Sequence, residues 1–252
     1  MKFYGSSSEE ILWGRQVVKE ALRARNAQKL YLEKKEAKGN YIKEVTELAQ
    51  NKNIPINYLN PEEFKKLTGS ETATGGVAVS VPLFKYWELD DLLTHSRASQ
   101  EPSLILILDH VEDPQNLGAL LRTAEAAGAV GVVLPRDRAA GVTPTVRRVS
   151  AGAAEWLPVV QVTNLARVVE ILQGSNYWIY GAEGVGNTLY YKADWNRKVA
   201  LVMGSEGKGI SRLVKDKCDV LLNIPMAGQI SSLNVSVAAG ILIYEHVRHK
   251  QR

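Results

Sequence analysis

The sequence predicts an α/β protein in which a parallel β-sheet, covered by helices on both faces, follows a smaller α/β domain. The main observation is a series of short apolar runs in the second half of the chain, most of them separated by helical patterns. These runs are SLILIL (103–108), VGVVL (130–134), YWIY (177–180), VALVM (199–203) and VLLNI (220–224). Continuous apolar runs without alternation are typical of strands buried on both faces, as in parallel sheets.

The first part of the chain is expected to form a separate α/β domain of residues 1–80. Ile11–Arg25 has apolar residues at helical spacing and predicts a first helix. The other expected elements are strands at 29–34, 56–59 and 75–83 and helices at 41–50 and 61–69, the last bounded by Pro61 and Gly69. Residues 81–102 are proline-containing and polar, which indicates a linker with one or two helical turns before a second domain of residues 103–252.

The composition excludes several classes of protein. The chain has 252 residues, of which 45% are hydrophobic and 23% charged, so it can bury an ordinary globular core. Its single cysteine, Cys218, excludes an internal disulfide framework and a cysteine-based zinc site, and the four histidines lack the spacing of metal ligands. We expect no metal.

The same composition bears on location and partners. The N-terminal segment MKFYGSSSEEILWG lacks the apolar run of a signal peptide. No segment approaches the roughly 18 apolar residues of a membrane helix, so we expect a cytoplasmic protein without a membrane partner. The net charge of +4 and the pI of about 9.0 permit a polyanionic partner without requiring one.

Three junctions between a strand and the following helix contain polar residues, and ligands of open α/β sheets bind at such strand ends. In the first junction, residues 108–129, Asp113 and Pro114 end the strand and Asn116 is expected to cap the helix. That helix carries Arg122 among alanines and leucines. An alternative role for Arg122 is a surface salt bridge to Glu125 at the i,i+3 position.

The second junction, residues 199–211, is rich in glycine. Gly204, Gly207 and Gly209 let the backbone turn sharply and approach a ligand closely. The spacing matches neither a P-loop nor the dinucleotide fingerprint, which removes the main support for ATP or NAD binding. Glu206 lies inside this turn, and its alternative role is that of a carboxylate facing a helix N-terminus.

The third junction, residues 223–245, leads into an apolar helix. Ile224 ends the strand, and Ser232 and Asn234 are expected at the start of the helix. Ser232, Ser236 and Gly240 also form a small-residue stripe, for which close helix packing is the alternative explanation. Packing does not explain Asn234, because a buried unpaired amide costs about 1–3 kcal/mol.

Taken together and in this order, the motifs N-x-G-x-x-x-R, G-S-E-G-x-G and I-P-M-x-G-x-x-S-S-L-N-V-S-V-A resemble those of the SpoU (TrmH) family of RNA ribose methyltransferases. The resemblance covers residues 104–246. The segments ILWGRQVVKEAL and ATGGVAVSV also resemble the substrate-binding extension of the RlmB-like subgroup, which methylates a guanosine ribose of 23S ribosomal RNA. The family implies a C-terminal trefoil knot and a homodimer built largely from the first and last helices of the catalytic domain.

The resemblance also implies a cofactor and a set of site residues. S-adenosylmethionine would bind in the knot loops, and the matching positions are Gly204, Glu206, Gly207, Ile224, Met226, Ser232 and Leu233. The family gives the key catalytic role to the position of Arg122, with Asn116, Glu206, Ser232 and Asn234 holding it and the ribose in place. Since the pKa of arginine exceeds about 12, Arg122 acts either as an assisted base or as a clamp on a phosphate.

RNA is the expected partner, and several alternatives stay open. Basic residues after the second strand of the catalytic domain are candidates for RNA contacts, and these are Arg136, Arg138, Arg147 and Arg148. The alternatives to a 23S guanosine methyltransferase are a tRNA guanosine methyltransferase and an rRNA adenosine methyltransferase of the antibiotic-resistance type. A non-catalytic RNA-binding factor in ribosome assembly is the alternative from another class.

Overall fold

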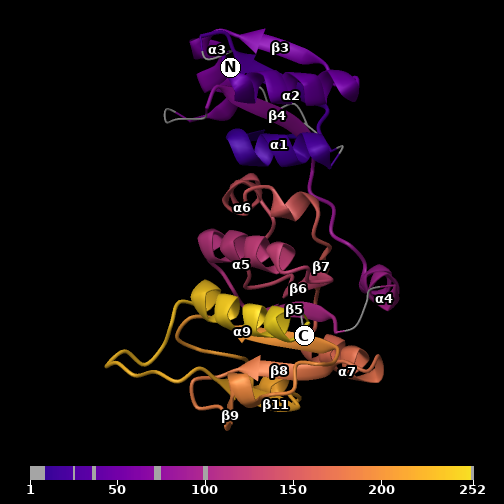
Figure 1. The fold of residues 1–252 in the computed structure, drawn as a ribbon, viewed down its shortest axis with the longest axis vertical. Coiled ribbons are helices and arrows are strands. Elements are labelled where there is room, and N and C mark those ends of the chain that lie inside the picture. The colour runs from indigo at the N-terminus through magenta and orange to yellow at the C-terminus, as the bar shows by residue number, and fades with distance from the viewer. Residues whose placement is uncertain (1–8, 25, 36–37, 71–74, 99–101, 251–252) are drawn as a thin grey trace. The chain divides into compact units, whose positions relative to one another are not determined.

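A computed structural model describes all residues except 1–8, 25, 36–37, 71–74, 99–101 and 251–252 (Figure 1). The chain forms two compact units. Unit 1 comprises Met1–Lys85 and Val142–Trp156, and unit 2 comprises Tyr86–Gly141 and Leu157–Arg252. This division differs from the expected boundaries, because a segment from the middle of the predicted catalytic domain belongs to unit 1.

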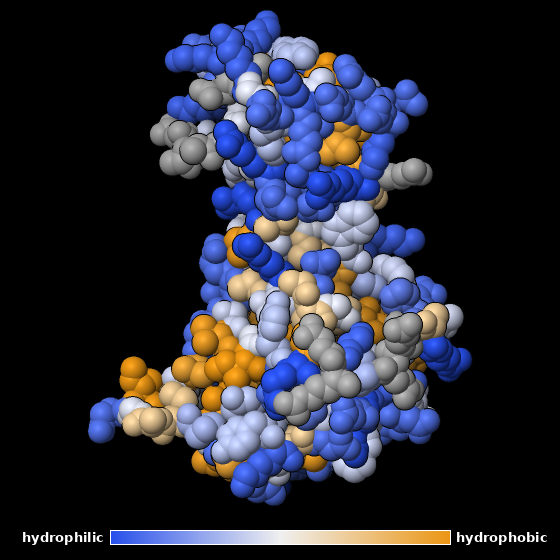
Figure 2. Space-filling view, in the orientation of Figure 1, coloured by the Kyte–Doolittle hydropathy of each residue, from blue (hydrophilic) through white to orange (hydrophobic). Residues whose placement is uncertain are grey.

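Unit 1 contains a four-stranded sheet in the order β1-β4-β2-β3, in which only β2 and β3 are parallel. Its elements are β1 (Glu9–Trp13), α1 (Arg15–Arg23), β2 (Lys29–Glu33), α2 (Asn40–Asn51), β3 (Ile56–Leu59), α3 (Pro61–Thr68), β4 (Val77–Pro82), α6 (Pro144–Val149) and the short 3-10 helix η1 (Ala153–Glu155). A cluster of buried aliphatic side chains from β1, β2, β4, α1 and α2 forms the core. The face of this unit that Figure 2 shows is largely hydrophilic.

The first expected helix is shorter than predicted, because its first residues form a strand. Ile11 and Leu12 belong to β1, which pairs antiparallel with β4. Gly14 adopts φ +107, a conformation that favours glycine, and separates this strand from α1. Helix α3 begins and ends as predicted: Asn60 and Glu63 form a capping box, and Gly69 adopts the left-handed conformation after the last turn.

The segment Val142–Trp156 is fixed in unit 1 by a buried arginine. Arg147 has 0% exposure, and its Nε and Nη2 donate to the two carboxylate oxygens of Glu155 at 2.7 and 2.9 Å. Its Nη1 donates to Glu10 Oε2 at 2.8 Å and to the carbonyl oxygen of Pro82 at 3.1 Å. The prediction that Arg147 contacts RNA is therefore wrong, because its guanidinium group is buried and its hydrogen bonds are made to groups of unit 1.

Unit 2 contains a seven-stranded sheet in the order β7-β6-β5-β10-β8-β11-β9, and all its strand pairs are parallel. Its strands are β5 (Leu104–Asp109), β6 (Gly131–Pro135), β7 (Val159–Val162), β8 (Trp178–Ala182), β9 (Thr188–Leu189), β10 (Val199–Gly204) and β11 (Val220–Asn223). The predicted parallel α/β sheet is confirmed. All five apolar runs are strands, whereas the short strands β7 and β9 were not predicted.

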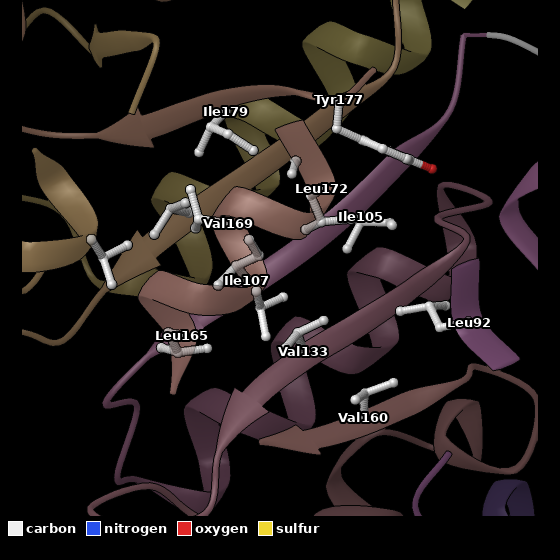
Figure 3. Close-up of a cluster of buried hydrophobic side chains, with 14 of the residues drawn as sticks. Leu92, Ile105, Ile107, Val133, Val160, Leu165, Val169, Leu172, Tyr177 and Ile179 are labelled. Carbon is white, nitrogen blue, oxygen red and sulfur yellow. The ribbon is translucent and has the colours of Figure 1, made fainter. Parts of the chain in front are cut away.

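Helices cover both faces of this sheet. They are α4 (Leu89–Arg97), α5 (Pro114–Ala126), α7 (Leu165–Gly174), α8 (Arg212–Lys215) and α9 (Val235–Lys250), and Tyr190–Lys192 form the 3-10 helix η2. On one face, a buried cluster joins Ile105 and Ile107 of β5 with side chains of α4, α7 and α8 (Figure 3). Since strand side chains alternate, Leu106 points to the opposite face, where α5 contacts β6 and α9, and α9 contacts β10 (Figure 1).

The expected linker contributes to unit 2. Helix α4 buries Leu92 and Leu93 in the cluster on one face of the sheet, and Trp87 forms a parallel bridge with Val160 of β7. Residues 99–101 of the expected linker lie outside the described residues. No helix in the described part of the chain is long and apolar enough to cross a membrane.

Candidate functional site

The three predicted motifs follow strands of the same sheet. Strands β5, β10, β8 and β11 are neighbours in that order, and Gly204 at the end of β10 is in register with Asp109 at the end of β5. Because all these strands are parallel, their carboxyl ends lie at one edge of the sheet. This arrangement brings the polar residues after β5, β10 and β11 together.

Three motif residues form one hydrogen-bonded cluster, with one residue from each motif. Asn234 Nδ2 donates to Glu206 Oε1 at 2.6 Å and to Asn116 Oδ1 at 2.9 Å. Asn116 Nδ2 lies 3.3 Å from the same oxygen of Glu206. The sequence positions of Asn116 and Asn234 differ by 118, so the fold alone makes this contact possible. We call these three residues the polar cluster.

The polar cluster also fixes the start of helix α9. Glu206 Oε1 accepts from the backbone N–H of Val235, the first residue of α9, which places a carboxylate at the positive end of the helix. Asn234 Oδ1 accepts from the backbone N–H and the hydroxyl of Ser236. Asn234 therefore precedes the helix rather than lying inside it, and its amide is fully partnered.

Asn116 has a different position from the one expected. Helix α5 begins at Pro114, and the capping side chain is Asp113, which accepts from the N–H of Gln115. Asn116 lies in the first turn and is half-buried. Because it does not cap the helix, its amide is available for the contacts with Glu206 and Asn234.

The glycine turn after β10 is closed by contacts between backbones. Ser205 and Gly209 exchange two backbone hydrogen bonds of 3.2 and 3.0 Å. A Cβ on Gly204 would lie 2.1 Å from the carbonyl carbon of Gly209, so no side chain fits there. Gly207 and Gly209 adopt φ values of +83 and +67. The turn therefore requires glycine for two reasons, close approach at Gly204 and positive φ at the other two positions.

The remaining residues expected at the cofactor site lie in the loop after β11. Ile224 and Leu233 are half-buried, whereas Met226 and Ser232 are exposed. Met226 is 39% exposed and Ile230 in the same loop is 73% exposed. No hydrogen bond of the Ser232 side chain to another described residue occurs. The loop thus presents apolar side chains and a hydroxyl without a described hydrogen-bond partner, and Asn234 at its end contacts Glu206 in the glycine turn.

Arg122 does not join the polar cluster. It is exposed on α5, six residues after Asn116, which places the two side chains about 120° apart around the helix. Among the described residues, Arg122 has no ion pair and no hydrogen bond, so the alternative salt bridge to Glu125 is absent. A solvent-accessible guanidinium without a protein partner can bind an external anion.

Two carboxylates near the turn were missed by sequence reasoning. Glu183, after β8, accepts from the N–H of Ile210 at 3.3 Å and forms an ion pair with Lys215 at 3.0 Å. Asp109, at the end of β5, is 1% exposed and accepts from the N–H of Ser211 at 2.6 Å. A carboxylate directly after an apolar strand, at the edge where ligands bind, was the available signal for both. No group of potential metal ligands occurs in the described part of the chain.

Comparison with known families and proteins agrees with the motifs. The profile of the SpoU rRNA Methylase family matches residues 103–244, and that of the RNA 2′-O ribose methyltransferase substrate binding family matches residues 11–87. A Bacillus subtilis protein assigned to the TrmH family of tRNA/rRNA methyltransferases, YacO, is 42% identical over 97% of this chain and 98% of its own length. The 23S rRNA (guanosine-2′-O-)-methyltransferase RlmB of Xylella fastidiosa is 42% identical over 85% of this chain and 86% of its own.

A solved structure shares the fold. The crystal structure of the SpoU methyltransferase AviRb from Streptomyces viridochromogenes, in complex with AdoMet, superposes with a TM-score of 0.80. It is 23% identical, and the superposition covers 98% of this chain and 92% of that one.

Proposed function

The chain belongs to the SpoU rRNA methylase family, and from this premise we propose that it methylates a ribose 2′-hydroxyl of RNA with S-adenosylmethionine as the methyl donor. We propose a guanosine of 23S ribosomal RNA as the substrate, which would place the enzyme in the cytoplasm. The observation that carries the proposal is the polar cluster, because it joins one residue from each of the three motifs. The RlmB relative supports the choice of substrate.

The residues at the sheet edge fit S-adenosylmethionine. Adenosine requires apolar walls and a few backbone donors and acceptors. The glycine turn at Gly204 supplies bare backbone, and Ile224, Met226 and Leu233 supply apolar side chains on the adjacent loop. Glu206, Gly207 and Ser232 would complete this site, and Glu206 accepts from the backbone N–H of Val235 at the start of α9.

The protein's part of the chemistry is alignment and proton removal, since the donor supplies an already activated methyl group. Asn116, Glu206 and Asn234 hold one another in fixed positions and can orient a ribose through their remaining polar atoms. Arg122 has no described protein partner, which supports a role as a clamp on an RNA phosphate. Because a guanidinium group does not give up its proton readily, the clamp is a better role for Arg122 than that of an unassisted base.

A homodimer is part of the proposal. Helix α9 is apolar on most sides, and it leaves Val237 and Tyr244 52% and 51% exposed. Hydrophobic surface gathers over the N-terminal end of this helix and the neighbouring loop (Figure 2). A second copy of the chain covering α5 and α9 would remove this surface from water.

We also propose the trefoil knot expected of the family. Strand β11 lies between β8 and β9, although β9 and β10 separate it from β8 in the chain. The chain then continues into α9, which contacts α5 and strand β10. This insertion of a late strand between two earlier ones is compatible with a threaded chain.

For RNA binding, the proposal uses unit 1 and the basic residues that remain accessible. Arg136, Arg138 and Arg148 are exposed. Arg148 lies over the ring of Trp13, with its Cζ 5.2 Å from the ring centroid, which presents a flat cationic surface of the kind that stacks on RNA bases. The match of residues 11–87 to a substrate-binding family supports this assignment.

Arg122→Ala provides the test of the proposed function. We expect methyl transfer to a 23S transcript to fall at least about 100-fold, because alignment is lost, while the Kd for S-adenosylmethionine stays within about threefold. Arg167→Ala on the exposed surface of α7 is the control and should keep wild-type rates. A wild-type rate in Arg122→Ala would remove Arg122 from the mechanism.

Mapping 2′-O-methyl marks in cellular RNA with and without the protein tests the substrate. A lost mark on a 23S guanosine supports the proposal, whereas a lost mark on tRNA or on an rRNA adenosine would replace it with that alternative. Absence of cofactor binding by the wild type would favour the non-catalytic RNA-binding factor.

A further inference from the structure

Two carboxylates flank strand β10 at the point where the glycine turn begins. Asp109 at the end of β5 is in register with Gly204, the last residue of β10. On the other side of β10, Val202 is in register with Gly181 of β8, and Gly204 and Glu183 follow two residues later on each strand. The N–H of Glu183 still donates to a carbonyl oxygen of β11 at 2.9 Å, so its backbone continues the sheet. The two carboxylates therefore stand on either side of Gly204 in one row across the sheet.

Both carboxylates lie on the face of the sheet that packs against α4, α7 and α8. Side chains alternate along a strand, and Asp109 and Glu183 have the same alternation as the residues of β5 and β8 in the buried cluster on that face. The chain returns over the same face after the glycine turn, because a Cβ on Gly204 would collide with Gly209 and with the backbone nitrogen of Ile210. Ile210 is buried in the same cluster. The segment that closes the turn thus runs between the two carboxylates.

The two carboxylates accept from consecutive backbone N–H groups of this returning segment. Glu183 Oε1 accepts from the N–H of Ile210 at 3.3 Å, and Asp109 Oδ2 accepts from the N–H of Ser211 at 2.6 Å. Hydrogen bonds from N–H groups to ionised carboxylates are stronger than those to neutral acceptors. We call Asp109 and Glu183 the carboxylate pair.

The second oxygen of each carboxylate has a side-chain partner. Glu183 Oε2 pairs with Lys215 Nζ at 3.0 Å, and Asp109 Oδ1 lies 2.5 Å from His110 Nδ1. The side chains of Asp109 and Glu183 are 1% and 13% exposed. Because both oxygens are occupied and little of either side chain meets solvent, the carboxylate pair is suited to holding the backbone rather than to binding a ligand.

The tip of the turn is held separately, by the polar cluster. Glu206 Oε1 accepts from the backbone N–H of Val235 and from Asn234 Nδ2 at the start of α9. Helix α9 contacts α5 and β10 on the other face of the sheet. The bare backbone at Gly204 and Gly207 therefore lies between two anchors, the polar cluster at the tip and the carboxylate pair at the base.

A turn of this composition is costly to order. Three of its six residues, Gly204 to Gly209, are glycines, and glycine loses more conformational freedom on folding than any other residue. A ligand that binds bare backbone binds more weakly when it must also order that backbone. Anchors that fix the turn before the ligand arrives remove this cost.

We propose that the carboxylate pair positions the glycine turn for S-adenosylmethionine, which makes Asp109 and Glu183 positioning residues of the cofactor site. This inference rests on the proposed function. The carboxylates act through the backbone of Ile210 and Ser211, and their side chains are not required to touch the methyl donor.

Calorimetric titration of the full-length protein with S-adenosylmethionine tests the proposal. Glu183→Ala and Asp109→Ala should each raise the Kd at least about tenfold, because the turn must then be ordered on binding. Glu183→Gln and Asp109→Asn keep an oxygen that accepts from the same N–H, so they should stay within about threefold of the wild type.

Asp219→Ala is the matched control. Asp219 Oδ2 accepts from the backbone N–H of Ile179 at 2.7 Å, near the opposite end of β8, so this variant loses the same kind of hydrogen bond away from the turn. It should lower the urea midpoint about as much as Glu183→Ala and bind the cofactor like the wild type.

Amide hydrogen exchange provides a measurement that needs no variant. In the cofactor-free wild type, the N–H groups of Ile210 and Ser211 should exchange at least about 100-fold more slowly than in an unfolded chain. Fast exchange of both overturns the proposal even if the alanine variants do not fold.

Three calorimetric results also overturn it. These are alanine variants that bind within threefold of the wild type, Gln and Asn variants that bind as weakly as the alanine variants, and an equal loss in Asp219→Ala. A wild type that binds no S-adenosylmethionine overturns the proposed function itself, whereas alanine variants that bind as well as a binding wild type overturn the role of the carboxylate pair alone.

Discussion

Replacement of Arg147 by alanine should destabilise unit 1 far more than any surface substitution. The guanidinium has 0% exposure and donates to Glu155, Glu10 and the carbonyl oxygen of Pro82. The Glu155 side chain is also 0% exposed. Removal of the arginine leaves a buried carboxylate with Asn26 as its remaining described side-chain partner, at 2.8 Å.

The magnitude follows from the cost of an unpaired buried charge. Breaking a buried ion pair by removal of one partner costs about 3–5 kcal/mol. With a urea m-value of about 2 kcal/mol/M, the unfolding midpoint should decrease by about 2 M. Arg148→Ala is the matched control, because the neighbouring side chain is exposed and contacts the ring of Trp13, an interaction of about 0.5–1 kcal/mol.

Urea unfolding followed by tryptophan fluorescence measures the change, and amide hydrogen exchange identifies the unit that is affected. Faster exchange should be concentrated in α6, η1 and β1. The double variant Arg147→Met with Glu155→Met should recover most of the loss, since apolar side chains of similar volume can replace a buried pair. A loss for Arg147→Ala of less than about 1 kcal/mol, equal to that of Arg148→Ala, would refute the reasoning.

Two more predictions concern unit 2. Gly204→Ala places a Cβ 2.1 Å from the carbonyl carbon of Gly209, so it should weaken S-adenosylmethionine binding at least tenfold in calorimetry. The control Gly174→Ala, whose Cβ would have no atom within 4 Å, should leave the affinity unchanged. Equal affinities of the two variants would exclude the tight turn from the cofactor site. His246 is buried against Trp195, and burial lowers its pKa from 6.5 to about 4. Between about pH 6.5 and about pH 4, His246 is protonated in the unfolded state and neutral in the folded state. The free energy of unfolding should therefore fall as pH decreases through this range, by at most about 1.4 kcal/mol per pH unit. His246→Phe should remove this part of the pH dependence of urea midpoints, and an unchanged profile would contradict the assignment.

The sheet of unit 2 was predictable because its signal is local. Each buried parallel strand is a continuous apolar run, and the predicted runs differ from β5, β6, β8, β10 and β11 by one or two residues at their ends. Strand β1 was not predictable in the same way. Ile11 and Leu12 precede a helix and extend its apolar spacing, and only the pairing with β4, some seventy residues later, makes them a strand.

The site was predictable in part. The motifs contain Asn116, Glu206 and Asn234, and the structure places these side chains in hydrogen-bonding contact, while their catalytic roles stay predictions. Arg147 was assigned to RNA because it is basic and follows a strand. Its partner Glu10 is 137 residues away, and sequence spacing contains no information about such a pair.

The discontinuity of unit 1 affects how the protein is made. Residues 1–85 leave the ribosome first, but α6 and Arg147 follow only after the first strands of unit 2 have been synthesised. At about 5–20 residues per second, translation of residues 86–156 takes roughly 4–14 s. During that interval the nascent N-terminal sheet lacks the arginine that neutralises Glu10. Translation must therefore pass through part of unit 2 before unit 1 can reach its final structure.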